Sequence, residues 1–213
     1  MSDLGDVAWL SLRVSTMSVA LAALFGLPLG AWLGLAHFRG RWLVAAGVHT
    51  GMALPPVVVG LLVYLLLSRS GPLGALGWLY TSQAMVIAQT ILALPFVVGI
   101  TAAAVAAVPP ELGLQLRGLG ATAAQVRRAV LREARSGVVL AVATAFGRSL
   151  SEVGAVLMVG GNVEGHTRVL TTAVMLETGR GEFGAALALG GVLLSLALAV
   201  NLLVLRLQPR SAA

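Results

Sequence analysis

The sequence predicts an all-α integral membrane protein with about five transmembrane helices. Of its 213 residues, 58% are hydrophobic and only 10% are charged, and the mean hydropathy is +0.96. An ordinary soluble domain carries roughly 25% charged residues. The charged residues here are spaced so that long apolar stretches remain, each matching the roughly 20 residues that cross a bilayer as a helix. This composition excludes a disordered chain, a nucleic-acid-binding domain and an ordinary soluble enzyme.

The expected spans lie near residues 14–36, 43–67, 83–107, 137–160 and 184–206. The first and second are bounded by Arg residues that enclose 25 and 27 uncharged positions. A turn at Gly71–Gly74 precedes the third, and the fifth is uninterrupted. The Pro55–Pro56 pair in the second span removes backbone donors and is expected to bend it. No repeat or linker is visible, so residues 1–213 are interpreted as one domain.

The orientation follows from the 14 basic residues, all of which are Arg. Nine fall on the side of the 37–41 turn, the 109–135 segment and the C-terminus, four fall on the other side, and Arg148 lies inside the fourth span. Arg accumulates on the cytoplasmic side of membrane proteins, so we expect the N-terminus outside and the C-terminus inside. Asp3 and Asp6 stand where a signal peptide would be basic, so the first span is expected to remain in the protein.

Residues 109–135, PPELGLQLRGLGATAAQVRRAVLREAR, form the one long polar interruption. Apolar residues recur in helical steps, which predicts one apolar stripe, with Arg residues gathered away from it. The stripe comprises Leu112, Leu116, Leu119, Ala123, Val126 and Val130. Pro109–Pro110 followed by a carboxylate predicts a helix start, and Gly118 and Gly120 predict two short helices at an angle. A basic amphipathic helix lying on anionic lipid is the alternative.

Several chemistries find no support in the sequence. No phosphate-binding G-x-x-x-x-G-K-[ST] motif is present, because the chain has no Lys. The chain has no Cys, and its three His residues lack ligand spacing, so no metal site is predicted. An intramembrane enzyme would need a base near Ser149 or Ser151, and no His lies near them. A stand-alone secondary carrier is disfavoured because no inverted repeat is apparent.

The stretch GLGATAAQVRRAVLREARSG resembles the cytoplasmic loop of ATP-binding-cassette (ABC) importer permeases. That loop reads Glu-Ala-Ala, three residues, Gly, nine residues, Ile, one residue, Leu-Pro. Gly120 takes the Gly position and Val130 the Ile position, whereas Leu114–Leu116 and Arg132–Glu133 depart from the pattern. The resemblance implies coupling helices that dock on an ATPase subunit. The implied coupling residues are Gly118, Gly120, Ala121, Arg127 and Val130.

Residues Phe146–Gly190 resemble the oxyanion branch of these permeases, which serves sulfate, molybdate and tungstate. The shared features are Arg, three residues, Glu, one residue, Gly-Ala, and a later Gly-Asn. The segment TRVLTTAVMLET is most similar to tungstate permeases, and LPPVVVGLLVYLLLSRSGPLG resembles the same branch. The similarity covers about residues 50–205. It implies a MetI-like permease core of five helices, with the coupling loop between the third and fourth.

By this resemblance the chain is the permease subunit of a multi-pass bacterial inner-membrane importer. It is implied to be a homodimer that works with two ATP-binding subunits and an extracytoplasmic oxyanion-binding protein. ATP and Mg²⁺ are then held by the partner subunit, and this chain is expected to be non-catalytic and without a cofactor. A molybdate or sulfate permease is the alternative to a tungstate permease.

Two sets of polar residues are candidates for function. Arg148 and Glu152 are four residues apart in the fourth span, where a single charge costs roughly 2.5–3.5 kcal/mol. They form either a structural ion pair or a pathway contact at which Arg148 meets an oxyanion. Oxyanions require hydrogen-bond donors, and the outer loop after this span offers several. The candidates for outer contacts are Asn162, Thr167, Arg168, Thr171 and Thr172, with an ordinary polar loop as the alternative.

Overall fold

The computed structural model describes residues 4–207, and every regular element in that range is a helix. Three helices are long and apolar enough to cross a membrane: α1 (Leu4–Leu35), α4 (Ser82–Ala106) and α10 (Phe183–Leu207). Two sharply bent pairs bring the number of spans to as many as five: α2 (Arg41–Met52) with α3 (Pro56–Leu67), and α7 (Arg135–Leu150) with α8 (Gly154–Gly160). The predicted all-α membrane fold is confirmed. Asp3 and Arg210, which entered the charge argument, lie outside the described residues.

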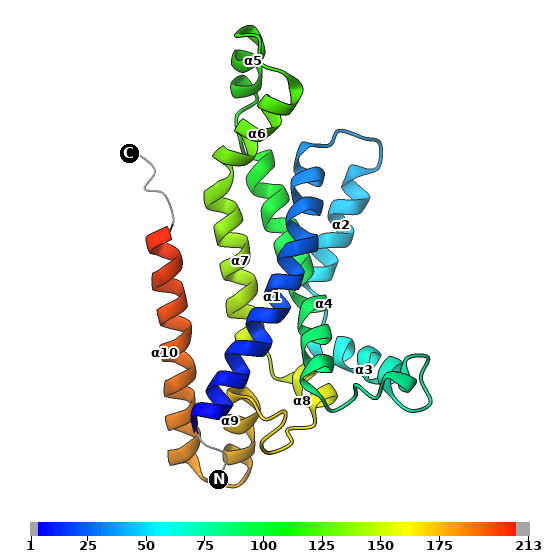
Figure 1. Cartoon of the computed structure of the whole chain (residues 1–213), viewed down its shortest axis with the longest axis vertical. Helices are drawn as coiled ribbons and strands as arrows, with labels where there is room; N and C mark the ends of the chain where they lie inside the picture. The colour runs from blue at the N-terminus through cyan, green and yellow to red at the C-terminus, as the bar shows by residue number, and fades with distance from the viewer. Residues whose placement is uncertain (1–3, 208–213) are drawn as a thin grey trace.

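Four shorter elements connect these spans. They are the 3-10 turn η1 (Gly74–Leu76), α5 (Pro110–Gly118), α6 (Ala123–Glu133) and α9 (Leu170–Gly179). Helices α5 and α6 form a hairpin that projects beyond α1, α4 and α7 at one end of the molecule (Figure 1). Helices α3, α8 and α9 lie at the opposite end, where α1 also begins. Residues 109–135 therefore form two short helices and not one continuous amphipathic helix.

The second span is broken at the proline pair. Pro55 is extended, with φ −63° and ψ 123°, and Pro56 is the first residue of α3. Proline is tolerated in the first turn of a helix but not in its interior, and it disfavours helical backbone in the residue before it. Helix α3 therefore leaves α2 at 92° and extends sideways from the bundle (Figure 1). The predicted bend is confirmed, and it is a complete break.

The fourth span is also broken, at residues 151–153, none of which is proline or glycine. Helix α7 ends at Leu150, and α8 restarts at Gly154 after a turn of 58°. Glu152 lies in this break and is only 6% exposed. Its carboxylate Oε1 accepts a hydrogen bond from the Ala155 N–H at 3.1 Å, which satisfies a free donor at the start of α8. The expectation of one helix over 137–160 is therefore wrong.

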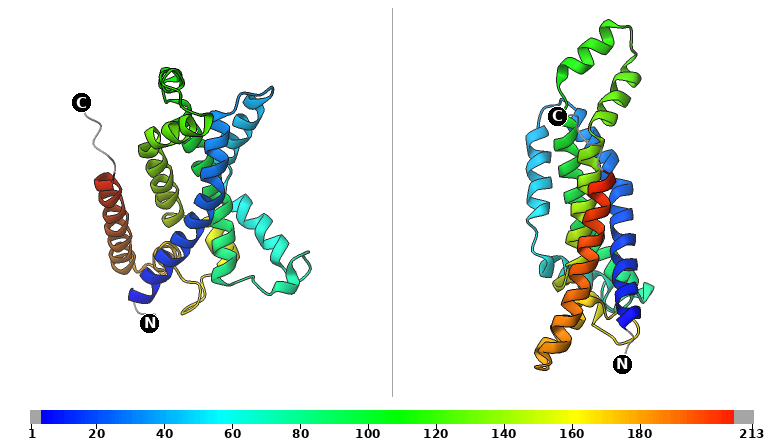
Figure 2. Two further views of the ribbon diagram at one scale, coloured as in Figure 1. Left: turned by 45° about the horizontal axis from the view of Figure 1, so that its top comes forward. Right: turned by 90° about the vertical axis from the view of Figure 1, so that its left-hand side faces the viewer.

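Glycines bring α1 and α4 into close contact. Gly26, Gly30 and Gly34 follow one another at four-residue steps along the α4-facing side of α1. A Cβ at Gly30 would lie 2.6 Å from the Val98 carbonyl oxygen, so only glycine permits this approach. Small residues have this role in membrane bundles because the hydrophobic effect gives no force between helices in lipid. Figure 2 shows α1, α4 and α7 running side by side as the central bundle.

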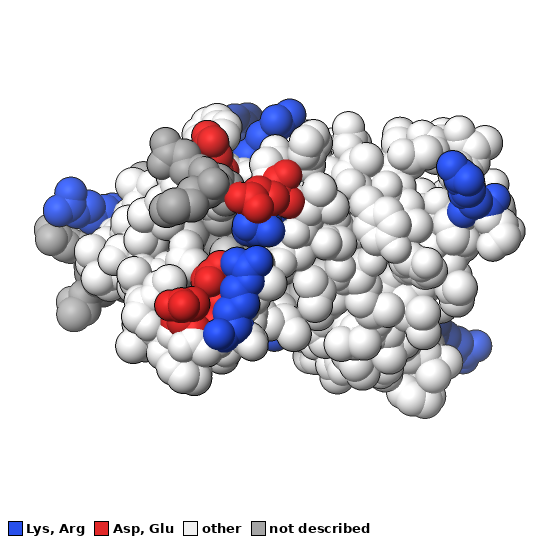
Figure 3. All heavy atoms as spheres, turned by 90° about the horizontal axis from the view of Figure 1, so that it is seen from below, with Lys and Arg blue, Asp and Glu red and all other residues white. Residues whose placement is uncertain are grey.

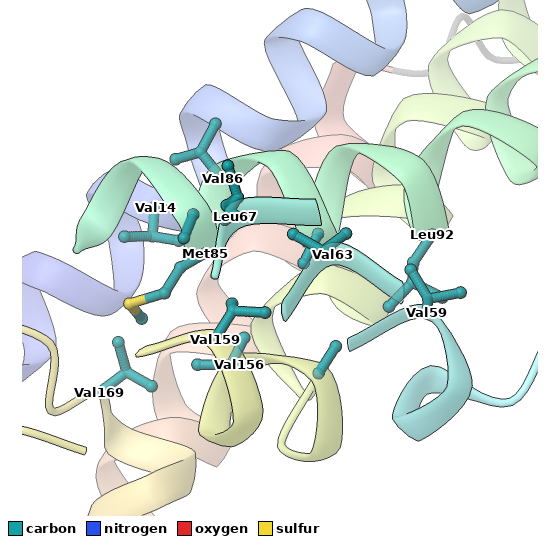
Figure 4. Close-up of a cluster of buried hydrophobic side chains, with 13 residues drawn as sticks. Val14, Val59, Val63, Leu67, Met85, Val86, Leu92, Val156, Val159 and Val169 are labelled. Atoms are coloured by element: carbon teal, nitrogen blue, oxygen red, sulfur yellow. The ribbon is translucent and has the colours of Figure 1, made fainter. Parts of the chain in front are cut away.

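The largest buried cluster lies where the two broken spans meet α4. Val59 and Val63 of α3, Met85 of α4, and Val156 and Val159 of α8 point toward one another (Figure 4). A Cβ at Gly60 of α3 would lie 2.8 Å from the Ala155 Cα of α8, so the two short helices are in backbone contact. This packing holds both breaks in place.

Candidate functional site

The turn between α5 and α6 is built on Gly120. Its φ is +84°, and the N–H groups of Gly120 and Ala121 donate to the carbonyls of Arg117 and Leu116, each at 2.9 Å. This pair of bonds is a Schellman motif, in which a left-handed residue ends a helix and satisfies its last carbonyls. The predicted interruption at Gly118 and Gly120 is confirmed, and Gly118 is the last residue of α5.

Helix α6 begins with a capping box that the sequence interpretation missed. The Gln125 N–H donates to Thr122 Oγ1 at 3.3 Å, and the Thr122 N–H donates to Gln125 Oε1 at 2.7 Å. The signal was present in the sequence, because Thr-x-x-Gln before a helical run is the pattern of this motif. The two caps together define where each short helix stops and starts, and they keep the hairpin angle.

The hairpin divides the predicted stripe between an inner and an outer face. Val126 is 7% exposed, and a Cβ at Gly113 of α5 would lie 3.5 Å from its Cγ1. Leu119 is instead 85% exposed at the tip, and Leu114, which lay outside the stripe, is 67% exposed. Exposed leucines on a projection beyond the spans are typical of a protein-binding surface. We call Leu114 and Leu119 the apolar tip.

The predicted coupling residues separate in space. Gly118, Gly120 and Ala121 lie at the turn beside the apolar tip. Arg127 and Val130 instead line a cavity of about 670 Å³ between the hairpin and the ends of α1 and α4. These two residues therefore line the cavity beside the membrane helices, although Arg127 is also exposed.

A buried hydrogen-bond network joins α1, α4 and α7 next to the break in the fourth span. Gln89 of α4 is 4% exposed, and its Oε1 accepts from the hydroxyl of Ser149 at 2.7 Å. The Ser18 hydroxyl of α1 lies 3.2 Å from the same Oε1 and 2.7 Å from the Val14 carbonyl. Its Nε2 donates to the Ser149 carbonyl at 3.0 Å. Such networks are favoured in membrane interiors because buried polar groups need partners there. In the sequence, the isolated Gln89 in an apolar span was the overlooked signal for this network.

Arg148 and Glu152 do not form the predicted pair. The Arg148 guanidinium lies over the Phe96 ring, 5.8 Å from its centroid, and the Arg148 residue is exposed. Glu152 caps α8, and its backbone carbonyl accepts from Thr171 Oγ1 at 2.9 Å. Among the residues that the structure describes, these two side chains make no ion pair with each other. The structural ion pair is therefore a wrong interpretation, because the helix that would align the two residues ends between them.

Three of the predicted outer contacts are threonines whose hydroxyls already donate hydrogen bonds to carbonyls of the same chain. Thr167 Oγ1 donates to the Gly160 carbonyl, Thr171 Oγ1 to Glu152, and Thr172 Oγ1 to Val169. All three residues are buried. A hydroxyl has one hydrogen, so in this conformation none of the three has a donor left for an anion. Their observed role is to shape the loop between α8 and α9.

Asn162 and Arg168 differ from the threonines because each has a buried polar atom without a partner. For Asn162, which has a φ of 52°, that atom is the acceptor Oδ1, which an anion does not satisfy. For Arg168 it is the donor Nε, while Nη1 lies 3.4 Å from Glu164 Oε2. Figure 3 views this end of the molecule and shows acidic and basic side chains close together on it. Of these two residues, Arg168 is therefore the one whose buried atom without a partner is a donor.

Comparison with known proteins places this fold and this hairpin in a family. Residues 26–212 match the model of the family described as "Binding-protein-dependent transport system inner membrane component". A probable anion ABC transporter permease of Haloferax volcanii is 45% identical over 97% of this chain and 91% of its own length. A tungstate uptake system permease of Peptoclostridium acidaminophilum is 40% identical over 95% of this chain and 89% of its own.

A solved structure supports the same fold. An inward-facing methionine ABC transporter superimposes with a TM-score of 0.76 over 97% of both chains, at 22% identity. The MetI-like architecture predicted from the sequence is thereby confirmed. The prediction of a permease subunit and not an enzyme is confirmed as well, since both relatives are permeases. The chain therefore belongs to the inner-membrane component family of binding-protein-dependent transport systems, as an ABC transporter permease of the oxyanion type.

Proposed function

We propose that this chain is the membrane subunit of an ATP-driven importer that carries tungstate. The observation that carries the proposal is the apolar tip on a projecting, doubly capped hairpin, in a chain 40% identical to a tungstate uptake permease. The proposed complex is a homodimer with two ATP-binding subunits, which hold ATP and Mg²⁺, and an extracytoplasmic oxyanion-binding protein. Molybdate and sulfate are the alternative substrates, because all three are tetrahedral dianions.

The connections of the hairpin supply a mechanism. Only Ala107–Pro109 separate α4 from α5, and Ala134 is the shared flanking residue of α6 and α7. A force applied to the apolar tip therefore reaches α4 and α7 directly. These two helices carry Gln89 and Ser149, whose hydrogen bonds lie beside the break in the fourth span. Closure of the ATPase pair would thus move the break and change the side of the membrane to which the transport pathway opens.

At the outer end we propose Arg168 as an oxyanion contact, with Asn162 beside it in the loop sequence. The support is the buried Nε donor without a partner and the charge of the guanidinium, whose planar fork matches an oxyanion. Thr167, Thr171 and Thr172 act indirectly in this proposal, because their hydroxyl bonds hold the backbone on both sides of Arg168.

The proposed orientation places the hairpin in the cytoplasm and the first turn of α1 outside. Figure 1 shows the α5–α6 hairpin, the α1–α2 turn, the start of α7 and the last turn of α10 toward the same end of the molecule. These segments carry Arg39, Arg41, Arg117, Arg127, Arg128, Arg132, Arg135 and Arg206. Only two acidic residues, Glu111 and Glu133, lie in the α5–α6 hairpin. Arg on short loops and span ends marks the cytoplasmic side.

Single cysteines test this orientation, because the chain has none of its own. In intact cells, an impermeant thiol reagent should label His166→Cys in the outer loop and should not label Gln115→Cys on α5. After permeabilisation both should react, since both residues are exposed. Labelling of Gln115→Cys alone in intact cells would invert the proposed topology.

Docking of an ATPase subunit is tested at the apolar tip. The wild-type chain, co-expressed with the ATP-binding subunit of its transporter, should co-purify with it and support ATP-dependent tungstate uptake in proteoliposomes that contain the binding protein. Leu119→Asp should weaken the association at least about tenfold, because burying a leucine is worth about 1.5–3 kcal/mol. Leu119→Met, which remains apolar, should retain it.

Three results would count against the proposal. Uptake that needs no ATP would indicate a secondary carrier, and failure of the wild type to bind an ATPase would exclude an ABC importer. Equal binding by Leu119→Asp and Leu119→Met would remove the apolar tip from the docking surface.

A further inference from the structure

A basic cavity lies where the hairpin joins the membrane helices. Its volume is about 670 Å³, and residues from the ends of α1 and α4, the start of α2, and helices α5 and α6 line it. Arg41, Arg117, Arg127 and His37 line it, and no Asp or Glu is among its lining residues. We call it the inner basic cavity. It is separate from the outer loop that carries Arg168 and lies at the other end of the molecule.

The cavity has a net positive charge. Arg41, Arg117 and Arg127 are among its lining residues, and no carboxylate in the lining offsets their charge. Arginine stays protonated in proteins, so the three guanidinium groups are cationic. Arg41 Nε donates to the Leu33 carbonyl at 3.1 Å, which ties one of its donors to the end of α1. The remaining donors of the three arginines come from three different elements.

We propose that the inner basic cavity binds a tetrahedral oxyanion. Arginine forks donate pairs of hydrogen bonds to such anions, and a dianion would offset most of the net charge. A ligand held by Arg41 on one side and by Arg117 and Arg127 on the other would bridge the membrane helices to the hairpin. The anion is either free, as the transported dianion or phosphate, or it is the phosphate of a lipid headgroup. That the inner basic cavity lies on the cytoplasmic side of the membrane rests on the proposed function.

Neighbouring arginines on α6 provide a matched test. Arg127 lines the cavity, whereas Arg128, one residue further along the same helix, does not. Sodium tungstate and inorganic phosphate are titrated calorimetrically into the purified full chain at low salt, in an Arg168→Gln background that removes the outer contact. We expect one saturable site per chain. Arg117→Gln and Arg127→Gln should each raise Kd about tenfold, the effect of losing a hydrogen bond to a charged group. Arg128→Gln should change Kd less than about twofold.

A second arm identifies the source of the anion. The same variants are reconstituted with phosphatidylglycerol or phosphatidylcholine, and retained lipid is counted by native mass spectrometry. Phosphatidylglycerol retained by the wild type, lost in Arg127→Gln and displacing tungstate would assign the site to a lipid headgroup. Tungstate binding unaffected by that lipid would assign it to a free anion. Either result supports the site.

The proposal is overturned if Arg127→Gln and Arg128→Gln weaken binding equally, which indicates diffuse attraction by the basic surface, or if neither variant changes Kd. A thermal unfolding midpoint for each variant separates loss of the site from loss of the fold. Binding is measured without an ATPase or ATP, so a failure of ATP-driven uptake would refute the proposed function and leave this site standing.

Discussion

Gly120→Val is expected to insert into the membrane at the wild-type level and to lose most oxyanion uptake. Gly120 has a φ of +84°, a conformation in which a β-branched residue is a steric outlier. A Cβ there would meet no atom within 4 Å, so the penalty arises from the backbone and not from crowding. Holding valine in such a conformation costs about 1–3 kcal/mol, which is enough to open the Schellman turn. The five apolar spans are unchanged.

The measurements are membrane-fraction yield, ATP-dependent uptake, and ATPase activity stimulated by the loaded binding protein. Uptake and stimulation should fall together as the hairpin loses its angle. Gly120→Asn is the control, because Asn adopts left-handed backbone more readily than other non-glycine residues. It should keep much of the wild-type uptake. Wild-type uptake by Gly120→Val with an ATPase bound would show that this turn has no role in coupling.

Glu152→Ala is expected to destabilise the protein by about 1–2 kcal/mol, and Arg148→Ala is expected to cost less. The Glu152 carboxylate satisfies the Ala155 N–H in a buried position, so its removal leaves a donor without a partner. Arg148 contacts a ring at 5.8 Å and is exposed, which is worth only about 0.5–1 kcal/mol. Glu152→Gln retains an acceptor oxygen and should recover most of the loss.

The double variant distinguishes the cap from an ion pair. Because the two side chains do not pair, the changes in unfolding midpoint of Arg148→Ala and Glu152→Ala should add. A buried ion pair would give the opposite result, since removing the second partner relieves the charge stranded by the first. A double variant more stable than Glu152→Ala alone would therefore support the ion-pair interpretation over the cap.

Local sequence features predicted the parts of this protein that depend on neighbouring residues. Hydropathy and the spacing of charges indicated the spans, because a bilayer imposes one length and one polarity on any helix that crosses it. The Pro55–Pro56 pair predicted the bend in the second span, and Gly120 predicted the turn in the hairpin, because both residues act through their own backbone. The Thr122 capping box belongs to the same class, although its signal was overlooked.

The sequence by itself thus determined an all-α membrane permease with a basic, glycine-broken loop. Only the tertiary structure decided which polar groups remain available. Ser149 meets Gln89 across 60 residues, and Thr171 meets Glu152 across 19 residues, so no local spacing shows that these groups are occupied. The cavity lined by Arg41, Arg117 and Arg127 likewise depends on distant elements. The physical reason is that a buried polar group takes whichever partner the packing of the helices brings to it, and that packing is a property of the whole chain.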